Sequence, residues 1–367
     1  MKTRTLLISS SLALWLLGCL VLFSATRWQG SAGLLLRQLA AGAVGLSLGL
    51  ALARLELSRL RQLTWPLYGA GLVSLAVVLA AGTSAKGAQR WLSLGPLGTI
   101  QPSEPMKLLL VLALAHLLTR LPARRAGGFL LAWVLTGVAF LMVAAQPDLG
   151  TGLVLVAVAF GMLWVAGASP VYLAGVAVGG LGALTFVLKE YQRDRIMVFL
   201  HPDLDPMGQG YSLMQSLTAI GSGQVFGRGL FAGHLTQQGF VPENWTDFAF
   251  TVVGEELGLA GSLGLLLLCA LQLGSLLVIA WRSQDYPRLL ATGVAVMLGF
   301  QLSVNLAMTM GMAPVVGIPL PLVSYGGSAL ITNLAALGLV AGLARRSPPR
   351  QATVHPLPVR QRLPLAG

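Results

Sequence analysis

Long apolar runs are the feature that most constrains how this chain can fold. A transmembrane helix needs roughly 20 apolar residues, and ten segments of about this length follow one another with few charges inside them. Only 10% of the 367 residues are charged, whereas a soluble domain carries roughly 25%. The predicted spans are residues 5–24, 32–53, 64–81, 103–118, 127–145, 149–166, 170–188, 248–280, 286–311 and 326–344. We therefore predict an all-α polytopic membrane protein with about ten transmembrane helices.

The distribution of cations predicts that both termini lie in the cytoplasm. With the N-terminus inside, 15 of the 24 Lys and Arg residues flank the spans on the inner side and 7 on the outer side, as the positive-inside rule requires. This bias explains much of the net charge of +12 without a nucleic-acid partner. In the cytoplasmic (inner) membrane, residues 1–346 then form one transmembrane domain. Its largest extracytoplasmic loop is 189–247, between helices 7 and 8, and residues 347–367 form a disordered cytoplasmic tail.

Ionisable residues inside the spans gather near their outer ends. Arg37 lies about two turns into its span, and Asp148 caps a short outer turn. Glu104 and Lys107 lie three residues apart, so they can pair on one helix face. Because a charge in the bilayer costs roughly 2.5–3.5 kcal/mol, such residues usually face a cavity. A cavity open to the outer leaflet fits this distribution better than a transport path, which needs polar groups near the midplane.

The eighth span, 248–280, is longer than a bilayer requires and has carboxylates at its outer end. A continuous helix places Asp247 about 12 Å beyond Glu255 and Glu256. At about 100° per residue, Glu255 lies nearer to the face of Asp247 than Glu256 does. We therefore expect Glu255 to share a cavity with Asp247.

Purely structural roles are open for several of these residues. Asp247 can act only as the N-cap of the following helix, since Asp is favoured at that position. Glu104 and Lys107 can form only a structural pair. Arg193 and Arg195, in the large outer loop, can be solvated charges with no substrate to bind.

Several motifs resemble the SEDS family (shape, elongation, division and sporulation), in order and over nearly the whole chain. The matching segments are residues 86–91, 101–107, 146–151, 205–211, 215–223, 246–248, 255–258 and 319–328. The first motif and the Pro-rich stretch 314–321 are more similar to RodA, the elongation branch, than to FtsW, the division branch. Two positions depart from the family pattern, Trp245 where His is usual and Pro105 where a larger apolar residue is usual. Neither departure changes a charged position.

The resemblance implies a peptidoglycan glycosyltransferase that polymerises lipid II, an undecaprenyl-diphosphate-linked disaccharide-pentapeptide, into glycan strands during elongation. The implied partners are the nascent strand, a class B penicillin-binding protein that crosslinks the product, and other membrane proteins of the elongation complex. Asp247 matches the family's essential aspartate, and our hypothesis is that it is the general base. The alternative roles for Asp247 are to position the acceptor sugar or to hold a divalent cation.

Further substrate-binding candidates follow from the charge of the diphosphate, which suits Arg and Lys. The cationic candidates are Arg37, Lys86, Arg90, Lys107, Arg193 and Arg195. The other candidates are Glu104, Asp148, Gln209, Tyr211, Glu255, Ser324 and Tyr325. Two alternative functions stay open at this point, a lipid II flippase and a non-catalytic scaffold for the transpeptidase.

Overall fold

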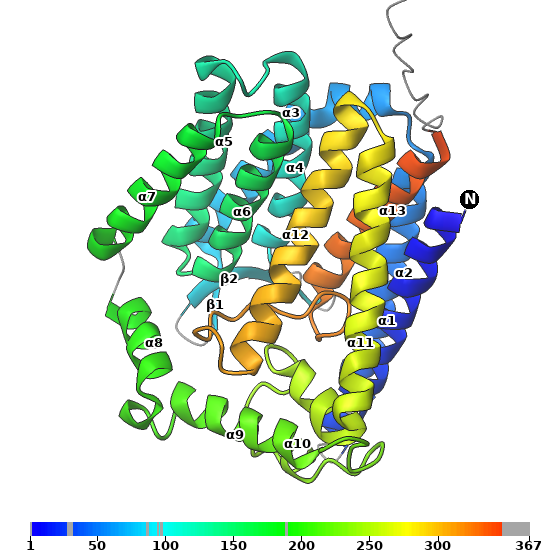
Figure 1. Cartoon of the computed structure of the whole chain (residues 1–367), viewed down its shortest axis with the longest axis vertical. Helices are drawn as coiled ribbons and strands as arrows, with labels where there is room; N and C mark the ends of the chain where they lie inside the picture. The colour runs from blue at the N-terminus through cyan, green and yellow to red at the C-terminus, as the bar shows by residue number, and fades with distance from the viewer. Residues whose placement is uncertain are drawn as a thin grey trace, which may run out of the picture.

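The structure, a computed structural model, is almost wholly helical (Figure 1). It describes residues 2–27, 32–85, 88–93, 95, 98–187 and 190–346. Lys86 and the predicted tail therefore lie outside the described residues. Each predicted span contains a helix: α1 (Lys2–Thr26), α2 (Ala32–Arg54), α3 (Leu57–Ala81), α4 (Ser103–Arg120), α5 (Ala126–Ala145), α6 (Leu149–Val165), α7 (Pro170–Val187), α11 (Ala249–Arg282), α12 (Asp285–Thr309) and α13 (Gly327–Arg346). The predicted all-α class is confirmed.

The lengths of the helices support a membrane protein. Among the described residues, seven helices are long and apolar enough to span a bilayer, namely α1, α2, α3, α5, α11, α12 and α13. Helices α6 and α7 are apolar but shorter, and α4 carries Glu104, Lys107 and Arg120. The number of crossings therefore stays a prediction.

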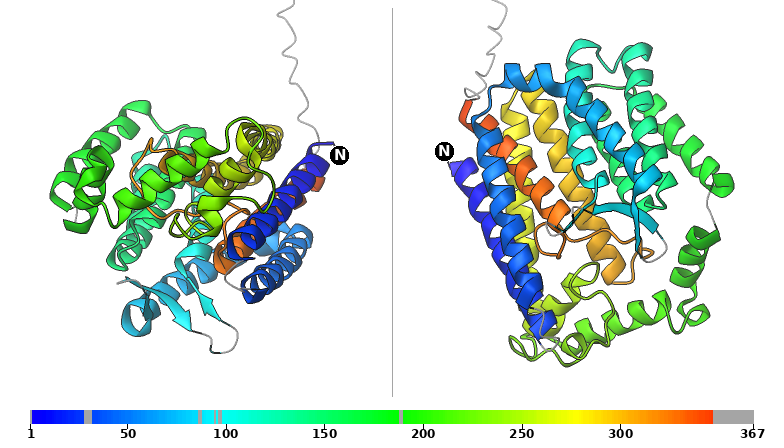
Figure 2. Two further views of the ribbon diagram at one scale, coloured as in Figure 1. Left: turned by 90° about the horizontal axis from the view of Figure 1, so that it is seen from below. Right: turned by 180° about the vertical axis from the view of Figure 1, so that it is seen from behind.

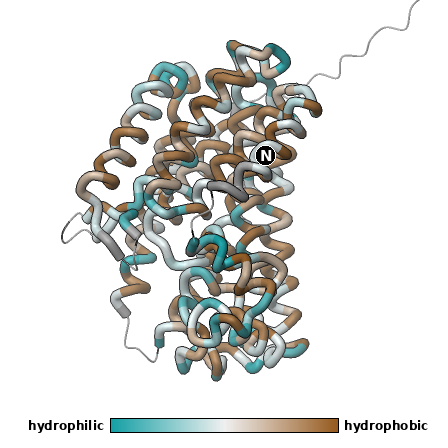
Figure 3. The backbone as a smooth tube through the Cα atoms, turned by 90° about the vertical axis from the view of Figure 1, so that its left-hand side faces the viewer, coloured by the Kyte–Doolittle hydropathy of each residue, from teal (hydrophilic) through white to brown (hydrophobic). Residues whose placement is uncertain are grey.

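The core of the bundle is built around α4, which is buried along nearly its whole length and packs against α3, α5, α6, α12 and α13. The outer helices expose large apolar side chains such as Leu36, Val73 and Leu141, as expected where the solvent is lipid. Apolar residues follow the helices along the bundle (Figure 3). Close packing of α2 on α13 depends on glycine, because a Cβ on Gly338 would lie 2.4 Å from the Cα of Gly49.

The segment between α7 and α11 is folded rather than irregular. It forms α8 (Glu190–Leu200), η3 (Pro202–Leu204), α9 (Gln209–Ser222) and α10 (His234–Gln237). These short helices lie across one end of the bundle (Figures 1 and 2). At the same end of α3 and α4, the strands β1 (Thr83–Ala85), β2 (Ala88–Ser93) and β3 (Thr99–Ile100) form a small antiparallel sheet.

Helix α11 is interrupted, which corrects the expectation of one continuous helix. Gly258 has φ 64° and ψ −157°, a conformation essentially restricted to glycine. The interruption frees backbone groups on both sides: Leu259 donates to the carbonyl of Gln224 at 2.9 Å, and Arg228 donates to the carbonyl of Glu255 at 3.0 Å. The kink thereby joins the segment after α9 to α11.

Candidate active site

Asp247 lies in the turn just before α11, and three neighbours hold its backbone. The side chain of Asn305 on α12 donates to the carbonyl of Asp247 at 2.8 Å. The Ser324 hydroxyl donates to the carbonyl one residue earlier. The backbone N–H of Tyr325 donates to the carbonyl two residues earlier at 2.8 Å. These bonds fix the position of the turn relative to α12 and to the segment before α13.

The carboxylate of Asp247 faces the Pro-rich segment 312–326. A Cβ placed on Gly317, which has φ +73°, would lie 3.5 Å from Asp247 Oδ2. Asn305 also donates to the carbonyl of Ile318 at 2.8 Å, so one side chain joins both segments. The N-cap of α11 is Phe248, with no side-chain capping bond. Phe248 rather than Asp247 thus occupies the N-cap position, and the half-buried Asp247 has its carboxylate beside a glycine.

The predicted pairing of Glu104 with Lys107 is confirmed, at 2.8 Å between Oε2 and Nζ. Lys107 also donates to the side-chain oxygen of Gln301 at 3.0 Å. Glu104 is 4% exposed and Lys107 1% exposed, so this pair is enclosed by protein and does not face an open cavity. Gln301 precedes Asn305 by one helical turn, or about 6 Å of helix. The pair therefore supports α12 directly below the residue that holds Asp247.

Asp148 and Arg90 form a second polar cluster. Asp148 caps α6 by accepting from the backbone N–H of Thr151 at 3.2 Å, which confirms its predicted capping role. Arg90 Nη1 lies 3.8 Å from Asp148 Oδ1, and Arg90 Nε donates to the carbonyl of Gln146 at 3.1 Å. The side chain of Gln101 donates to Asp148 at 3.0 Å. Arg90 thus fixes the turn before α6, and its role as a diphosphate ligand stays a prediction.

The expectation that Glu255 shares a cavity with Asp247 is wrong. Glu255 is fully buried, and its two oxygens accept from successive backbone amides of α10 at 2.8 and 2.9 Å. Glu256 is bound in the same way, by the Ser24 hydroxyl of α1 and by amides of the segment before α10. Both glutamates therefore anchor the outer segment to the bundle.

Arg37 does not face the interior either. It is exposed on α2, whereas the next residue, Gln38, is fully buried. Gln38 donates to the carbonyl of Ser324 at 3.3 Å and accepts from the backbone of Gly326 at 3.4 Å. Gln38 thus has the inward position that we expected for Arg37, and it fixes the segment that binds the Asp247 turn. The Ser324 hydroxyl likewise makes backbone contacts, since it also accepts from Leu320 at 2.9 Å.

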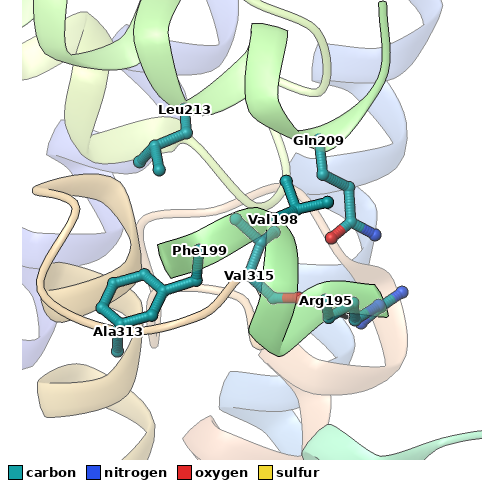
Figure 4. A pocket seen from close by; sticks show the side chains of 7 residues that line it. All are labelled: Arg195, Val198, Phe199, Gln209, Leu213, Ala313 and Val315. Atoms are coloured by element: carbon teal, nitrogen blue, oxygen red, sulfur yellow. Dashed lines mark hydrogen bonds between the residues drawn. The ribbon is translucent and has the colours of Figure 1, made fainter. Parts of the chain in front are cut away.

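Arg195 on α8 reaches the segment beside Asp247. Its Nη1 donates to the carbonyl of Val315 at 3.1 Å, two residues before Gly317. The side chain lines a cavity of about 10 Å³ between α8, α9 and residues 313–315 (Figure 4), which is room for about one water. The residues lining it are Arg195, Val198, Phe199, Gln209, Leu213, Ala313 and Val315.

The remaining candidates differ in position and burial. Gln209 lines the cavity, and its backbone N–H donates to Asp205 at 2.8 Å. Tyr211 is half-buried in the first turn of α9, and Tyr325 is half-buried after the Pro-rich segment. Arg193 is exposed on α8. In the described part of the chain, no group of three or more His, Cys, Asp and Glu side chains could hold a metal ion.

Sequence reasoning missed the uncharged polar residues of the site, above all Gln301 and Asn305. Both are fully buried, and Thr309 one turn later accepts through its carbonyl from Ser216 of α9 at 2.9 Å. The signal was their spacing of four residues within an apolar span, which places them on one face of α12. Because a polar group buried without a partner is costly, such a row indicates specific partners.

Similarity to known proteins covers nearly the whole chain. The family described as cell cycle protein, which groups FtsW, RodA and SpoVE, matches residues 4–348. The peptidoglycan glycosyltransferase MrdB of Escherichia coli (strain K12) is 39% identical over 345 residues, which cover 91% of this chain and 92% of MrdB. The probable peptidoglycan glycosyltransferase FtsW of Aeromonas salmonicida (strain A449) is 39% identical over 298 residues, which cover 78% of this chain and 75% of that protein.

Solved structures show the same fold. One, described as showing the structural coordination of polymerization and crosslinking by a peptidoglycan synthase complex, aligns with a TM-score of 0.80 at 39% identity. The alignment covers 92% of this chain and 96% of the matched chain. The rod shape determining protein RodA of Thermus thermophilus aligns with a TM-score of 0.71 at 36% identity, covering 93% of this chain and 96% of that one. A variant of that RodA with one Asp replaced by Ala aligns with a TM-score of 0.72.

Proposed function

This chain belongs to the SEDS family of FtsW, RodA and SpoVE, and from that premise we propose that it is a lipid II polymerase whose general base is Asp247. It is a peptidoglycan glycosyltransferase, as its relatives are named. The similarity to RodA favours elongation as its setting. The observation that carries the residue assignment is the anchored turn, which presents the Asp247 carboxylate beside Gly317.

In this proposal the acceptor is the 4-hydroxyl of a GlcNAc, which attacks the anomeric carbon of the donor lipid II. The new C–O bond forms as the bond to the diphosphate breaks, and undecaprenyl diphosphate leaves. The proton of the hydroxyl passes to the carboxylate of Asp247. The transition state resembles an oxocarbenium ion, for which two carboxylates are common in glycoside hydrolysis. Here one carboxylate is sufficient, because a diphosphate needs neutralisation by cations more than it needs a general acid.

Arg195 is the first candidate for the diphosphate. The guanidinium matches phosphate oxygens and already contacts the Pro-rich segment that faces Asp247. Lys107 and Arg90 are less suitable, because Glu104 and the turn before α6 occupy them. We propose Gln209, on the same cavity, as a contact for the sugar or the diphosphate.

Substrate binding at this cavity requires a change in the region. A cavity of about 10 Å³ cannot admit a sugar, so a sugar that enters between α8, α9 and residues 313–315 must displace them. The segment after α9 is bonded to the interrupted helix α11, and the two glutamates anchor α10 and the residues before it. We expect this motion to be the step at which a partner acts.

The proposed partner is a class B penicillin-binding protein that crosslinks the product. The support is the similar structure described as a peptidoglycan synthase complex that coordinates polymerization and crosslinking. We place the protein in the cytoplasmic membrane with both termini inside, because the Lys and Arg residues are then mostly cytoplasmic.

The decisive test of function is whether purified protein converts lipid II into glycan strands that a gel resolves. If the protein is a polymerase, glycan strands form with the protein alone or with its transpeptidase partner. A flippase predicts that lipid II crosses the bilayer of a proteoliposome and stays monomeric. A scaffold predicts no strands from this chain under either condition, and strand synthesis that follows another enzyme.

The metal role of Asp247 has a separate test. Since the described residues contain no cluster of three or more His, Cys, Asp and Glu side chains suited to a metal, we expect a divalent cation at Asp247 to take further ligands from the substrate diphosphate. Polymerisation would then stop in a chelator and return with Mg²⁺. A base that acts without metal predicts that the rate survives chelation.

A further inference from the structure

A polar basin lies at the end of the bundle away from α8, α9 and α10. It is a cavity of about 220 Å³, lined by residues from the first turns of α3 and the last turns of α4. The lining residues are Arg61, Gln62, Trp65, His116 and Arg120. The predicted topology places this end at the cytoplasmic boundary of the bilayer. The catalytic proposal uses none of these side chains.

The basin carries two cations without a neutralising acid. Arg61 and Arg120 are both exposed at its rim, and neither pairs with a carboxylate among the described residues. The guanidinium of Arg61 lies 4.5 Å from the ring centroid of Tyr286, which is fully buried. This cation–π contact holds Arg61 in place. Two adjacent cations, one of them held by an aromatic ring, favour an anionic ligand.

His116 adds an unsatisfied polar group beside the cavity. It is 5% exposed, and neither of its ring nitrogens makes a hydrogen bond of ordinary geometry, the backbone of Arg61 offering a weak contact at most. The ring of Trp65 packs edge-on against it, with the ring centroids 5.6 Å apart. Buried polar atoms without partners are rare in native structures and indicate a missing water, ion or ligand. A ligand oxygen at the floor of the basin would satisfy this histidine.

The surroundings favour a lipid over a soluble anion. Trp65 is 41% exposed, as is typical of aromatic residues at head-group depth. Leu63 on the same helix is 46% exposed, so this part of α3 also presents apolar surface that acyl chains can contact. Basic pockets between transmembrane helices on the cytoplasmic side bind anionic lipid head groups. We propose that the basin binds the phosphate of an anionic phospholipid, through Arg61, Arg120 and His116.

Native mass spectrometry of the purified full-length protein, titrated with phosphatidylglycerol or phosphatidylcholine, tests this proposal. We expect selective binding of phosphatidylglycerol. The double variant Arg61→Gln with Arg120→Gln should weaken the binding of phosphatidylglycerol about thirtyfold, because each cation near a membrane surface contributes about one kcal/mol. The matched control is Arg59→Gln, an exposed cation on the same helix that lies 3.7 Å from Glu56. We expect the control to change the affinity less than about twofold.

Three outcomes would overturn the proposal. Equal binding of the two lipids would exclude a site selective for anionic lipid. A loss of affinity in the Arg59→Gln control as large as in the double variant would show that general surface charge causes the binding. Glycerol 3-phosphate that binds as tightly as the lipid would assign the basin to a soluble phosphate. Because Arg61 packs on Tyr286, the single variant Arg120→Gln, at an exposed position, provides an independent check. It should weaken lipid binding about fivefold.

Discussion

Polar side chains that contact one another inside the bundle determine where Asp247 lies. Asn305 is central among them, because its side-chain nitrogen donates to the carbonyls of both Asp247 and Ile318 at 2.8 Å. Gln301 and Lys107 support the turn of α12 below it. Because the side chains of Asn305 and Gln301 bond to protein groups around the Asp247 turn and α12, we regard these two as positioning residues.

Replacing Asn305 should lower activity without changing any charge. Asn305→Ala leaves two carbonyls without donors, at a cost of about 1–3 kcal/mol each. Without these two bonds the Asp247 carboxylate should be displaced, and polymerisation should slow roughly ten- to hundredfold. Initial rates of glycan-strand formation and thermal unfolding in detergent measure both effects. The matched control is Ser303→Ala, at an exposed position of the same helix, and it should leave both unchanged. An Asn305→Ala protein with the wild-type rate would remove the positioning role.

The enclosed pair of Glu104 and Lys107 should show strong coupling. Lys107→Met leaves a buried carboxylate without its cation and should destabilise the protein by about 3–5 kcal/mol. The double variant, with Glu104→Gln added, removes the charge and should recover much of that loss. A double-mutant cycle of unfolding free energies measures the coupling. Strictly additive losses would show that the two residues do not act as a pair.

At the scale of elements, the interruption of α11 determines how the outer segment is attached. Gly258 allows the backbone of residues 224–229 to bond on both sides of the break. Glu255 and Glu256 then bind the segment around α10. This short stretch of α11 thus attaches α10 and the segment after α9, while α9 is also bonded to α12 through Ser216 and Thr309.

Gly258→Ala should detach this segment. The new Cβ would lie 2.3 Å from the backbone nitrogen of Gly227, and the backbone conformation is strained for any side chain by about 1–3 kcal/mol. Limited proteolysis should cleave the segment between α9 and α11 faster, and the melting temperature should fall. The control is Gly264→Ala, where nothing lies within 4 Å of the new Cβ and alanine favours helix. Equal proteolysis of the two variants would refute this account.

Helices and one ion pair were predictable from the sequence, whereas the orientation of side chains was not. The length of an apolar run and its lack of charged residues predict a spanning helix. The spacing of three residues predicts the pair of Glu104 and Lys107. The inward face of α2 was not predictable, because lipid allows both faces to be apolar, and Gln38 rather than Arg37 faces inside. The position of Glu255 depended on a straight helix that Gly258 interrupts.

Across the whole molecule, the proposed function places the two ends of the bundle in different compartments. Asp203, exposed in η3, then lies outside, and Arg59, near the start of α3, lies inside. In a protein without native cysteines, Asp203→Cys should react with a membrane-impermeant maleimide in intact spheroplasts. Arg59→Cys should react only after permeabilisation. The opposite pattern would invert the topology and place the Asp247 turn in the cytoplasm.

The central claim is that Asp247 accepts the proton of the attacking hydroxyl, and one measurement tests it most directly. Purified wild-type and Asp247→Asn proteins, matched for melting temperature, are given lipid II, and the initial rate of strand formation is followed. General base catalysis contributes about 10²–10⁴-fold, so we predict a loss of that size in Asp247→Asn and none in the loop control Asp203→Asn. A folded Asp247→Asn protein that polymerises lipid II at the wild-type rate would contradict the account.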